Sequence, residues 1–63
     1  MMSIRFYMRF PGSFYAEGPI TLCNERGKKL DDTASERAVR KALRSYLNLD
    51  RLPRGFEVWP TND

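Results

Sequence analysis

The chain has 63 residues, of which 41% are hydrophobic, 13% aromatic and 30% charged, with 11 Lys and Arg against 8 Asp and Glu. This length predicts a single small domain over residues 1–63 and excludes a second hydrophobic core. The aromatic and charged fractions exclude a fully disordered chain. Because a domain of this size buries only about 60% of its unfolded surface, nearly every large apolar side chain is needed in the core or at an interface.

An alternating pattern over residues 3–10 predicts the first strand, with one face toward a core and the other outward. The side chains of the core-facing set are Ile4, Phe6, Met8 and Phe10. The side chains of the outward set are Arg5, Tyr7 and Arg9. Pro11-Gly12 then predicts a tight turn into a second strand over residues 14–23. Gly18-Pro19 interrupts that strand and predicts a bulge or an edge position.

A helix is predicted over residues 34–47. Thr33, followed three residues later by Glu36, is typical of a capping box at the helix start. The core-facing stripe at helical spacing is formed by Ala38, Val39, Ala42, Leu43, Tyr46 and Leu47. Asn48 predicts a left-handed residue that ends the helix. A short last strand over residues 56–59 is ended by Pro60.

These elements predict an α+β fold of ββαβ order, a three-stranded antiparallel sheet with the helix packed on one face. The strand order 2-1-3 places the most apolar strand in the centre. It leaves the two proline-interrupted strands at the edges, where a missing backbone N–H is tolerated.

Residues that carry catalysis are scarce. Histidine is absent, which removes the most common general base and metal ligand. Cys23 is the single cysteine, so a disulfide within the chain is excluded, and its apolar neighbours predict a buried, inert thiol. Asp31 and Asp32 are explained by the start of a helix, and the glycines are scattered singly without a phosphate-binding pattern. We therefore predict a protein that is not an enzyme, with no cofactor and no metal ion.

The location predicted from the sequence is cytoplasmic, without a membrane partner. The start of the chain lacks an apolar run of signal-peptide length, and no segment approaches the length of a membrane span. A single cysteine fits a reducing compartment.

Two surfaces carry the residues predicted to bind a partner. The first is the outward sheet face, with Arg5, Tyr7, Arg9 and Trp59. Arginine and aromatic side chains on this face are typical of a protein interface or of a nucleic-acid platform. The alternative is that Glu17 and Glu57 form ordinary cross-strand ion pairs with Arg5 and Arg9. An outward position for Tyr15 and Glu17 depends on where the bulge falls. Trp59 is either an exposed anchor or a cover for the edge of the core.

The second surface is the polar helix face, with Arg37, Arg40, Lys41 and Arg44. From residue 37 to residue 54 the chain carries six positive charges and one negative charge, Asp50. Such a run fits either an electrostatic binding surface or an ordinary solvated helix face.

The segment from Tyr46 to Val58, with Leu52-Pro53-Arg54-Gly55-Phe56-Glu57-Val58, resembles the small phage-encoded inhibitors of bacterial RNA polymerase. That family has nearly the same length, and its helix is also followed by a Pro-x-Gly-Phe-Glu-Val strand. The resemblance implies a small protein that blocks a host assembly by occupying a surface. The chain departs from the family at Trp59-Pro60, where the family has arginines, and in its basic helix.

The sequence thus predicts a small binding protein, a phage or mobile-element antagonist that occupies an acidic surface of a host macromolecular machine. The alternative is a nucleic-acid-binding module or transcriptional regulator that uses the same residues. A third interpretation is a symmetric dimer with a self-complementary sheet face, so both a monomer and a homodimer are open.

Overall fold

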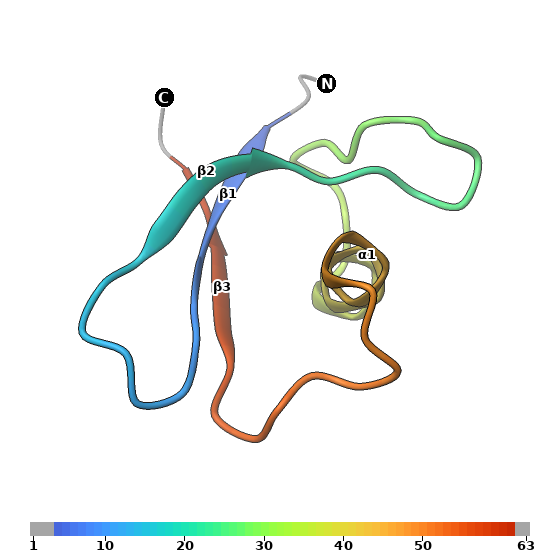
Figure 1. The fold of residues 1–63 in the computed structure, drawn as a ribbon. Coiled ribbons are helices and arrows are strands. Elements are labelled where there is room, and N and C mark those ends of the chain that lie inside the picture. Colours follow the sequence, from blue (N-terminus) through green and yellow to red (C-terminus); the bar gives the residue numbers. More distant parts are fainter. Residues whose placement is uncertain (1–3, 62–63) are drawn as a thin grey trace.

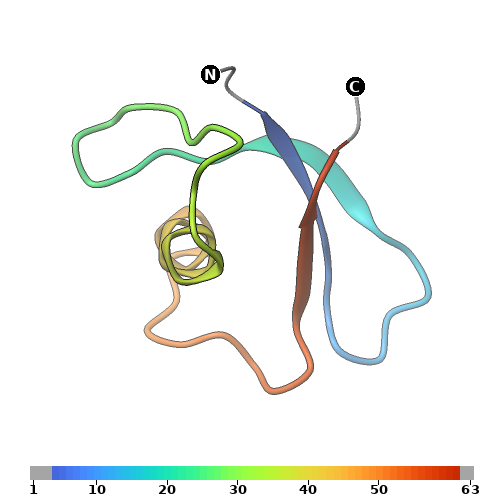
Figure 2. The same ribbon diagram turned by 180° about the vertical axis from the view of Figure 1, so that it is seen from behind.

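In the computed structural model, which describes residues 4–61, three strands and one helix follow the order β1 (Arg5–Arg9), β2 (Glu17–Thr21), α1 (Glu36–Leu47) and β3 (Glu57–Pro60). The strands form one sheet of order β2-β1-β3, in which β1 is antiparallel to both neighbours. The helix lies over one face of this sheet, and the opposite face is left bare by the described elements (Figures 1 and 2). The predicted ββαβ architecture and strand order are therefore confirmed.

The hydrophobic core lies between the sheet and α1. Its buried side chains are Phe6, Met8, Leu22, Leu30, Val39, Ala42, Leu43 and Phe56. Ile4 and Phe10 are half-buried and pack against this cluster, so the core-facing row predicted for the first strand is confirmed. The predicted helical stripe is confirmed at Val39, Ala42, Leu43 and Leu47. Ala38 is half-buried but lies outside the core cluster, and Tyr46 is 53% exposed in the last turn of the helix.

A bulge interrupts the pairing of β1 with β2, as Gly18-Pro19 predicted. Phe6 pairs with Ile20 and Met8 pairs with Glu17, so Tyr7 alone lies opposite Gly18 and Pro19. Gly18 has φ +134°, and a Cβ atom built on it would lie 2.8 Å from the carbonyl oxygen of Phe6. Only glycine fits this close approach without a shift of the backbone. The peptide bond between Gly18 and Pro19 is cis.

The start of the helix differs from the sequence prediction. Ser35, not Thr33, is the N-cap, and its hydroxyl accepts a hydrogen bond of 3.1 Å from the backbone N–H of Ala38. The hydroxyl and backbone N–H of Thr33 instead donate to Oδ1 of Asp31, which leaves Thr33 outside the helix. Asn48 ends the helix in the left-handed conformation, with φ 58° and ψ 46°, as predicted.

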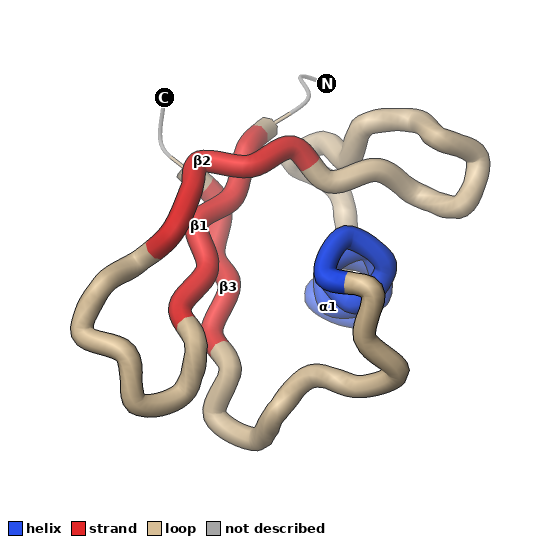
Figure 3. Tube along the Cα trace, in the orientation of Figure 1, coloured by secondary structure: helices blue, strands red, loops and turns tan. Residues whose placement is uncertain are grey.

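The strands are shorter or shifted relative to the sequence prediction (Figure 3). Ser3 lies outside the described residues. The second strand begins at Glu17 rather than Phe14, because the Ser13 hydroxyl hydrogen-bonds both the backbone N–H and C=O of Tyr15 and draws that segment into a local turn. The third strand begins at Glu57 rather than Phe56, whose N–H donates to Pro53 across a turn.

Candidate functional site

The bare face of the sheet carries an aromatic pair at its centre. Tyr7 of β1 lies opposite Trp59 of β3 in the strand register, and their rings stack with centroids 6.2 Å apart and an interplanar angle of 30°. The Tyr7 ring also lies against Gly18, since a Cβ atom there would be 3.1 Å from the ring. Trp59 is 37% exposed. The two rings therefore cover each other, and the Tyr7 ring also covers the neighbouring backbone of β2 at Gly18.

The charges on this face are partly compensated within the sheet. Arg9 lies opposite Glu57 in the register, and its Nε donates to Oε1 of Glu57 at 2.9 Å, with a second contact from Nη2 to the same oxygen. Both side chains are partly exposed, so the pair contributes at most about 1 kcal/mol to stability. Arg5 lies opposite Thr21. Glu17 lies opposite Met8, and this register places it on the core-facing side of the sheet rather than beside Tyr7.

The outward face of α1 carries four cations, which extend from the first turn of the helix to its last turn. At roughly 100° per residue, positions 37, 40, 41 and 44 lie within about 100° of arc, and this arc is opposite the buried Val39, Ala42 and Leu43. Arg37 and Lys41 are exposed, whereas Arg40 and Arg44 are half-buried.

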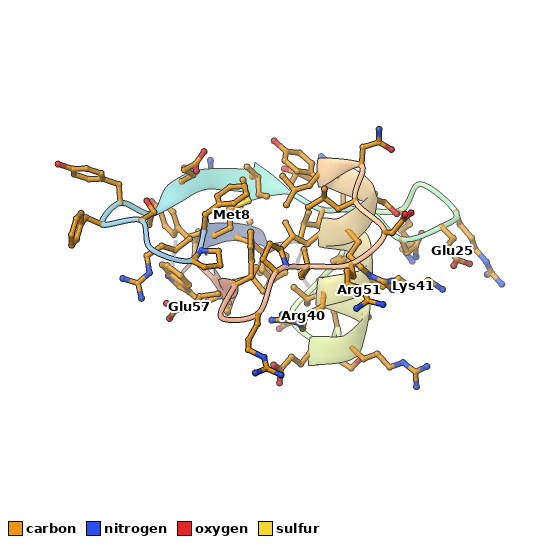
Figure 4. The ribbon with its side chains drawn as sticks, turned by 60° about the horizontal axis from the view of Figure 1, so that its bottom comes forward. Met8, Glu25, Arg40, Lys41, Arg51 and Glu57 are labelled. Atoms are coloured by element: carbon orange, nitrogen blue, oxygen red, sulfur yellow. The ribbon has the colours of Figure 1, made fainter. Side chains whose placement is uncertain are left out.

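The guanidinium groups of Arg40 and Arg44 are held by backbone carbonyl oxygens. Arg40 Nη1 donates to the carbonyl of Phe56 at 3.4 Å, and Arg44 Nη1 donates to the carbonyl of Asp50 at 3.2 Å. Carbonyl acceptors orient a guanidinium but leave its positive charge uncompensated. Neither arginine belongs to a salt bridge among residues 4–61. These contacts tie α1 to the connection that runs to β3 (Figure 4).

Lys41 is the exception on this face, because it pairs with Glu25 on the loop that follows β2. The hydrogen bond and the charge of Lys41 lower the pKa of the Glu25 carboxyl below its usual value. In Figure 4 the Lys41 side chain extends from the helix toward Glu25. The pair lies along a groove of about 330 Å³ between the loop and α1, and Leu30, Ala38 and Ala42 line its apolar part.

Cys23 also lines this groove and is exposed, so the predicted buried thiol is wrong. Successive side chains of an extended segment point to opposite sides. Because Leu22 is buried, the next side chain, that of Cys23, points outward. Within the described part of the chain, no group of three or more Cys, Asp or Glu side chains is placed to hold a metal ion.

The eight residues predicted to bind a partner lie on two separate surfaces, the same two into which the sequence divided them. Arg5, Tyr7, Arg9 and Trp59 lie on the bare sheet face, and the four helix cations lie on the outer side of the opposite layer.

One feature was missed by the sequence prediction. Phe14 and Tyr15 are the most exposed large apolar side chains described, at 92% and 79%, and they lie in the loop that joins β1 to β2. A half-buried strand needs apolar and polar residues in alternation, and two consecutive aromatic residues break that pattern. This break in the sequence could have indicated that Phe14 and Tyr15 lie outside the strand.

Comparison with protein-family models, with curated proteins and with solved structures finds no match to the chain. Among residues 4–61, α1 is neither long enough nor apolar enough to span a lipid bilayer.

Proposed function

We propose that this chain is a non-catalytic binding protein that lays the outward face of α1 on an acidic surface of a protein assembly. The observation that carries the proposal is the set of cations opposite the buried face of the helix, Arg37, Arg40 and Arg44, which belong to no salt bridge among residues 4–61. Lys41 lies on the same face but is paired with Glu25. Between residues 37 and 56 the only acidic side chain is Asp50, while Arg51 and Arg54 add two further positive charges. Such a concentration of one sign steers an oppositely charged partner and sets its orientation.

Preorganisation favours the helix face over the sheet face as the contact surface. Arg40 and Arg44 are already held by carbonyl groups, so less side-chain entropy is lost when they meet a carboxylate. Arg9, in contrast, would have to give up Glu57 before it could bind an external acid.

The aromatic pair supports a protein partner over a nucleic acid. Sheet platforms that read single-stranded nucleic acids offer open ring faces and uncompensated cations to bases and phosphates. Here Tyr7 and Trp59 stack on each other, and the neighbouring Arg9 is paired with a carboxylate. The resemblance of residues 46–58 to phage inhibitors of bacterial RNA polymerase supports a bacterial machine as the target.

The test is affinity capture from a bacterial extract, with and without nuclease, at several salt concentrations. The double variant Arg37→Glu/Arg44→Glu is compared with Lys28→Glu/Lys29→Glu, which has the same change in net charge on the loop. Repulsion between the new carboxylates and an acidic partner should reduce the free energy of binding by more than about 1.4 kcal/mol. We therefore expect the helix variant to bind at least about tenfold more weakly than the unchanged protein. The loop variant should bind as the unchanged protein does.

Two results would contradict the proposal. Equal binding by both charge variants would show that the helix face is not the contact surface. Loss of the captured material after nuclease treatment, together with a steep linear fall of log affinity with log salt, would identify a nucleic acid as the partner instead.

A further inference from the structure

The outer edge of β3 lies at the side of the sheet and is paired with no other strand. The strand order is β2-β1-β3, and no strand among residues 4–61 lies beyond β3 (Figure 2). We propose that this edge accepts an extended segment of a protein partner as an added strand, with a lysine or arginine of that segment in the groove beside β3. In such complexes backbone hydrogen bonds supply affinity and side-chain pockets supply specificity. The site is separate from the outward face of α1, and its occupant has the opposite charge.

The strand pairing determines which backbone groups of β3 are open to a new strand. The Thr61 N–H donates to the carbonyl of Arg5 on β1 at 2.8 Å. Alternate residues of an antiparallel strand direct their N–H and C=O groups toward the same neighbour, so those of Trp59 also face β1. Val58 and Pro60 therefore direct theirs away from the sheet. Because proline has no N–H, the open edge offers the N–H and C=O of Val58 and the C=O of Pro60.

A groove of about 250 Å³ lies beside this edge, between β3 and the segment that leads into α1. Ile4, Phe6, Val39 and Val58 line its apolar part. The Val58 side chain packs against the core, so the groove lies on the core side of the sheet. Since the side chains of a strand alternate between the two faces, every second side chain of an added strand would point into this groove.

The charged part of the groove lining consists of three carboxylates, those of Asp31, Asp32 and Glu36. Asp32 and Glu36 are exposed, and neither belongs to an ion pair among residues 4–61. No lysine or arginine of the described residues lines the groove. The groove is therefore locally negative, although the net charge of the whole chain is +3.

A lysine or arginine side chain matches both parts of this lining. Its methylene groups can contact the apolar walls while its cationic end reaches the carboxylates. The neighbouring residues of an added strand would point to the bare face of the sheet, where the Trp59 ring is 37% exposed. The segment that fits best thus alternates basic residues, on the groove side, with apolar residues beside Trp59.

The unpaired carboxylates disfavour other occupants of the edge. Nucleic-acid phosphates and anionic lipid headgroups would be repelled by Asp32 and Glu36. An antiparallel dimer formed by two β3 edges would place the carboxylates of both copies on the same face of one continuous sheet, and like charges oppose this pairing. A basic segment of another protein meets neither obstacle.

The first measurement follows hydrogen exchange of the β3 amides by nuclear magnetic resonance, with the full chain. In the protein alone, the Val58 amide should exchange much faster than the Trp59 amide, which is bonded to β1. The probe is a short synthetic peptide in which lysine and valine alternate, with both ends blocked. Its addition should slow exchange at Val58 at least about tenfold. Unchanged exchange at Val58 with the peptide at about 1 mM would overturn the proposal, and so would a Val58 amide already as protected as that of Trp59.

The second measurement separates strand pairing from simple charge attraction, with the fluorescence of Trp59, the single tryptophan, reporting binding. Two further peptides are N-methylated, one at every lysine and the other at every valine. Only alternate N–H groups of an added strand face β3, so one of these two peptides should lose binding and the other should keep it. Equal binding by the two would show that the peptide does not pair with the edge.

The third measurement tests the carboxylates. Asp32→Asn/Glu36→Gln should weaken binding of the lysine peptide at least about tenfold and leave unchanged the weaker binding of a peptide with norleucine in place of lysine. Glu17→Gln/Asp50→Asn is the matched control, since it makes the same change in net charge at two exposed acids outside the groove. Equal effects of the two double variants, or equal binding of the lysine and norleucine peptides by the unchanged protein, would overturn the assignment of a basic side chain to the groove.

Discussion

Leu43 should be the most costly single truncation on α1, because its side chain is 0% exposed and lies between the helix and the sheet. Replacing a buried leucine by alanine removes transfer free energy and leaves a cavity, at a cost of about 2–5 kcal/mol. A domain of 63 residues has a total free energy of unfolding of roughly 3–9 kcal/mol. Leu43→Ala should therefore remove a large share of the stability and, at the upper end of this range, unfold the chain.

Leu49 provides the matched control, since it is the same residue type just after the helix but is 40% exposed. Leu49→Ala should cost less than about 1 kcal/mol. Urea unfolding at 25 °C, followed by far-ultraviolet circular dichroism, measures both variants. With a slope near 1 kcal/mol per molar urea, Leu43→Ala should lower the midpoint by about 2 M or more. Equal midpoint shifts for the two variants would refute the assignment of Leu43 to the centre of the core.

Three further changes test the backbone and the loop before the helix. Gly18→Ala should destabilise the fold more than Gly12→Ala, because only at Gly18 does the added Cβ atom meet a carbonyl oxygen; urea midpoints compare the two. Ser35→Ala should cost about 1 kcal/mol through loss of the N-cap bond, measured in the same way. Hydrogen bonds from the hydroxyl and then the N–H of Thr33 lower the folded-state pKa of Asp31, so their stabilisation is present at neutral pH and is lost as the pH falls through that lowered pKa. Asp31→Asn should therefore flatten the decline of stability below the ordinary aspartate pKa of about 3.9, and an unchanged decline in that acid range, measured by urea midpoints, would contradict this.

The general architecture could be predicted from the sequence because it depends on strong periodic signals. The alternation from Ile4 to Phe10 is compatible with only one arrangement, a strand that buries its apolar face. The structure buries that face. The central position of β1 followed from the placement of Pro19 and Pro60, since edge strands tolerate the missing N–H. Asn48 was predictable because few residue types other than glycine accept a left-handed conformation.

The differences arise where side chains compete for the same backbone groups. Thr33 and Ser35 are both good N-cap residues, but Asp31 engages the hydroxyl of Thr33, and the cap passes to Ser35. Phe14 and Tyr15 have high strand propensity, yet Ser13 bonds the backbone of Tyr15 and the strand begins only after them. Propensity alone does not decide such competitions, because each depends on a side-chain hydrogen bond a few residues away.

The bulge at Gly18 determines which acids share a face with the predicted binding residues. With regular pairing, Glu17 would have continued the alternation of β2 and reached the same face as Tyr7; the extra residue places it opposite Met8 instead. Glu57 on β3, where no bulge occurs, keeps its register with Arg9 and compensates its charge. No comparable register brings a carboxylate to Arg40 or Arg44, because their partners are carbonyl groups of an irregular connection. The difference in available charge between the sheet face and the helix face thus follows from strand pairing, and it is the reason to expect the acidic partner on the helix side.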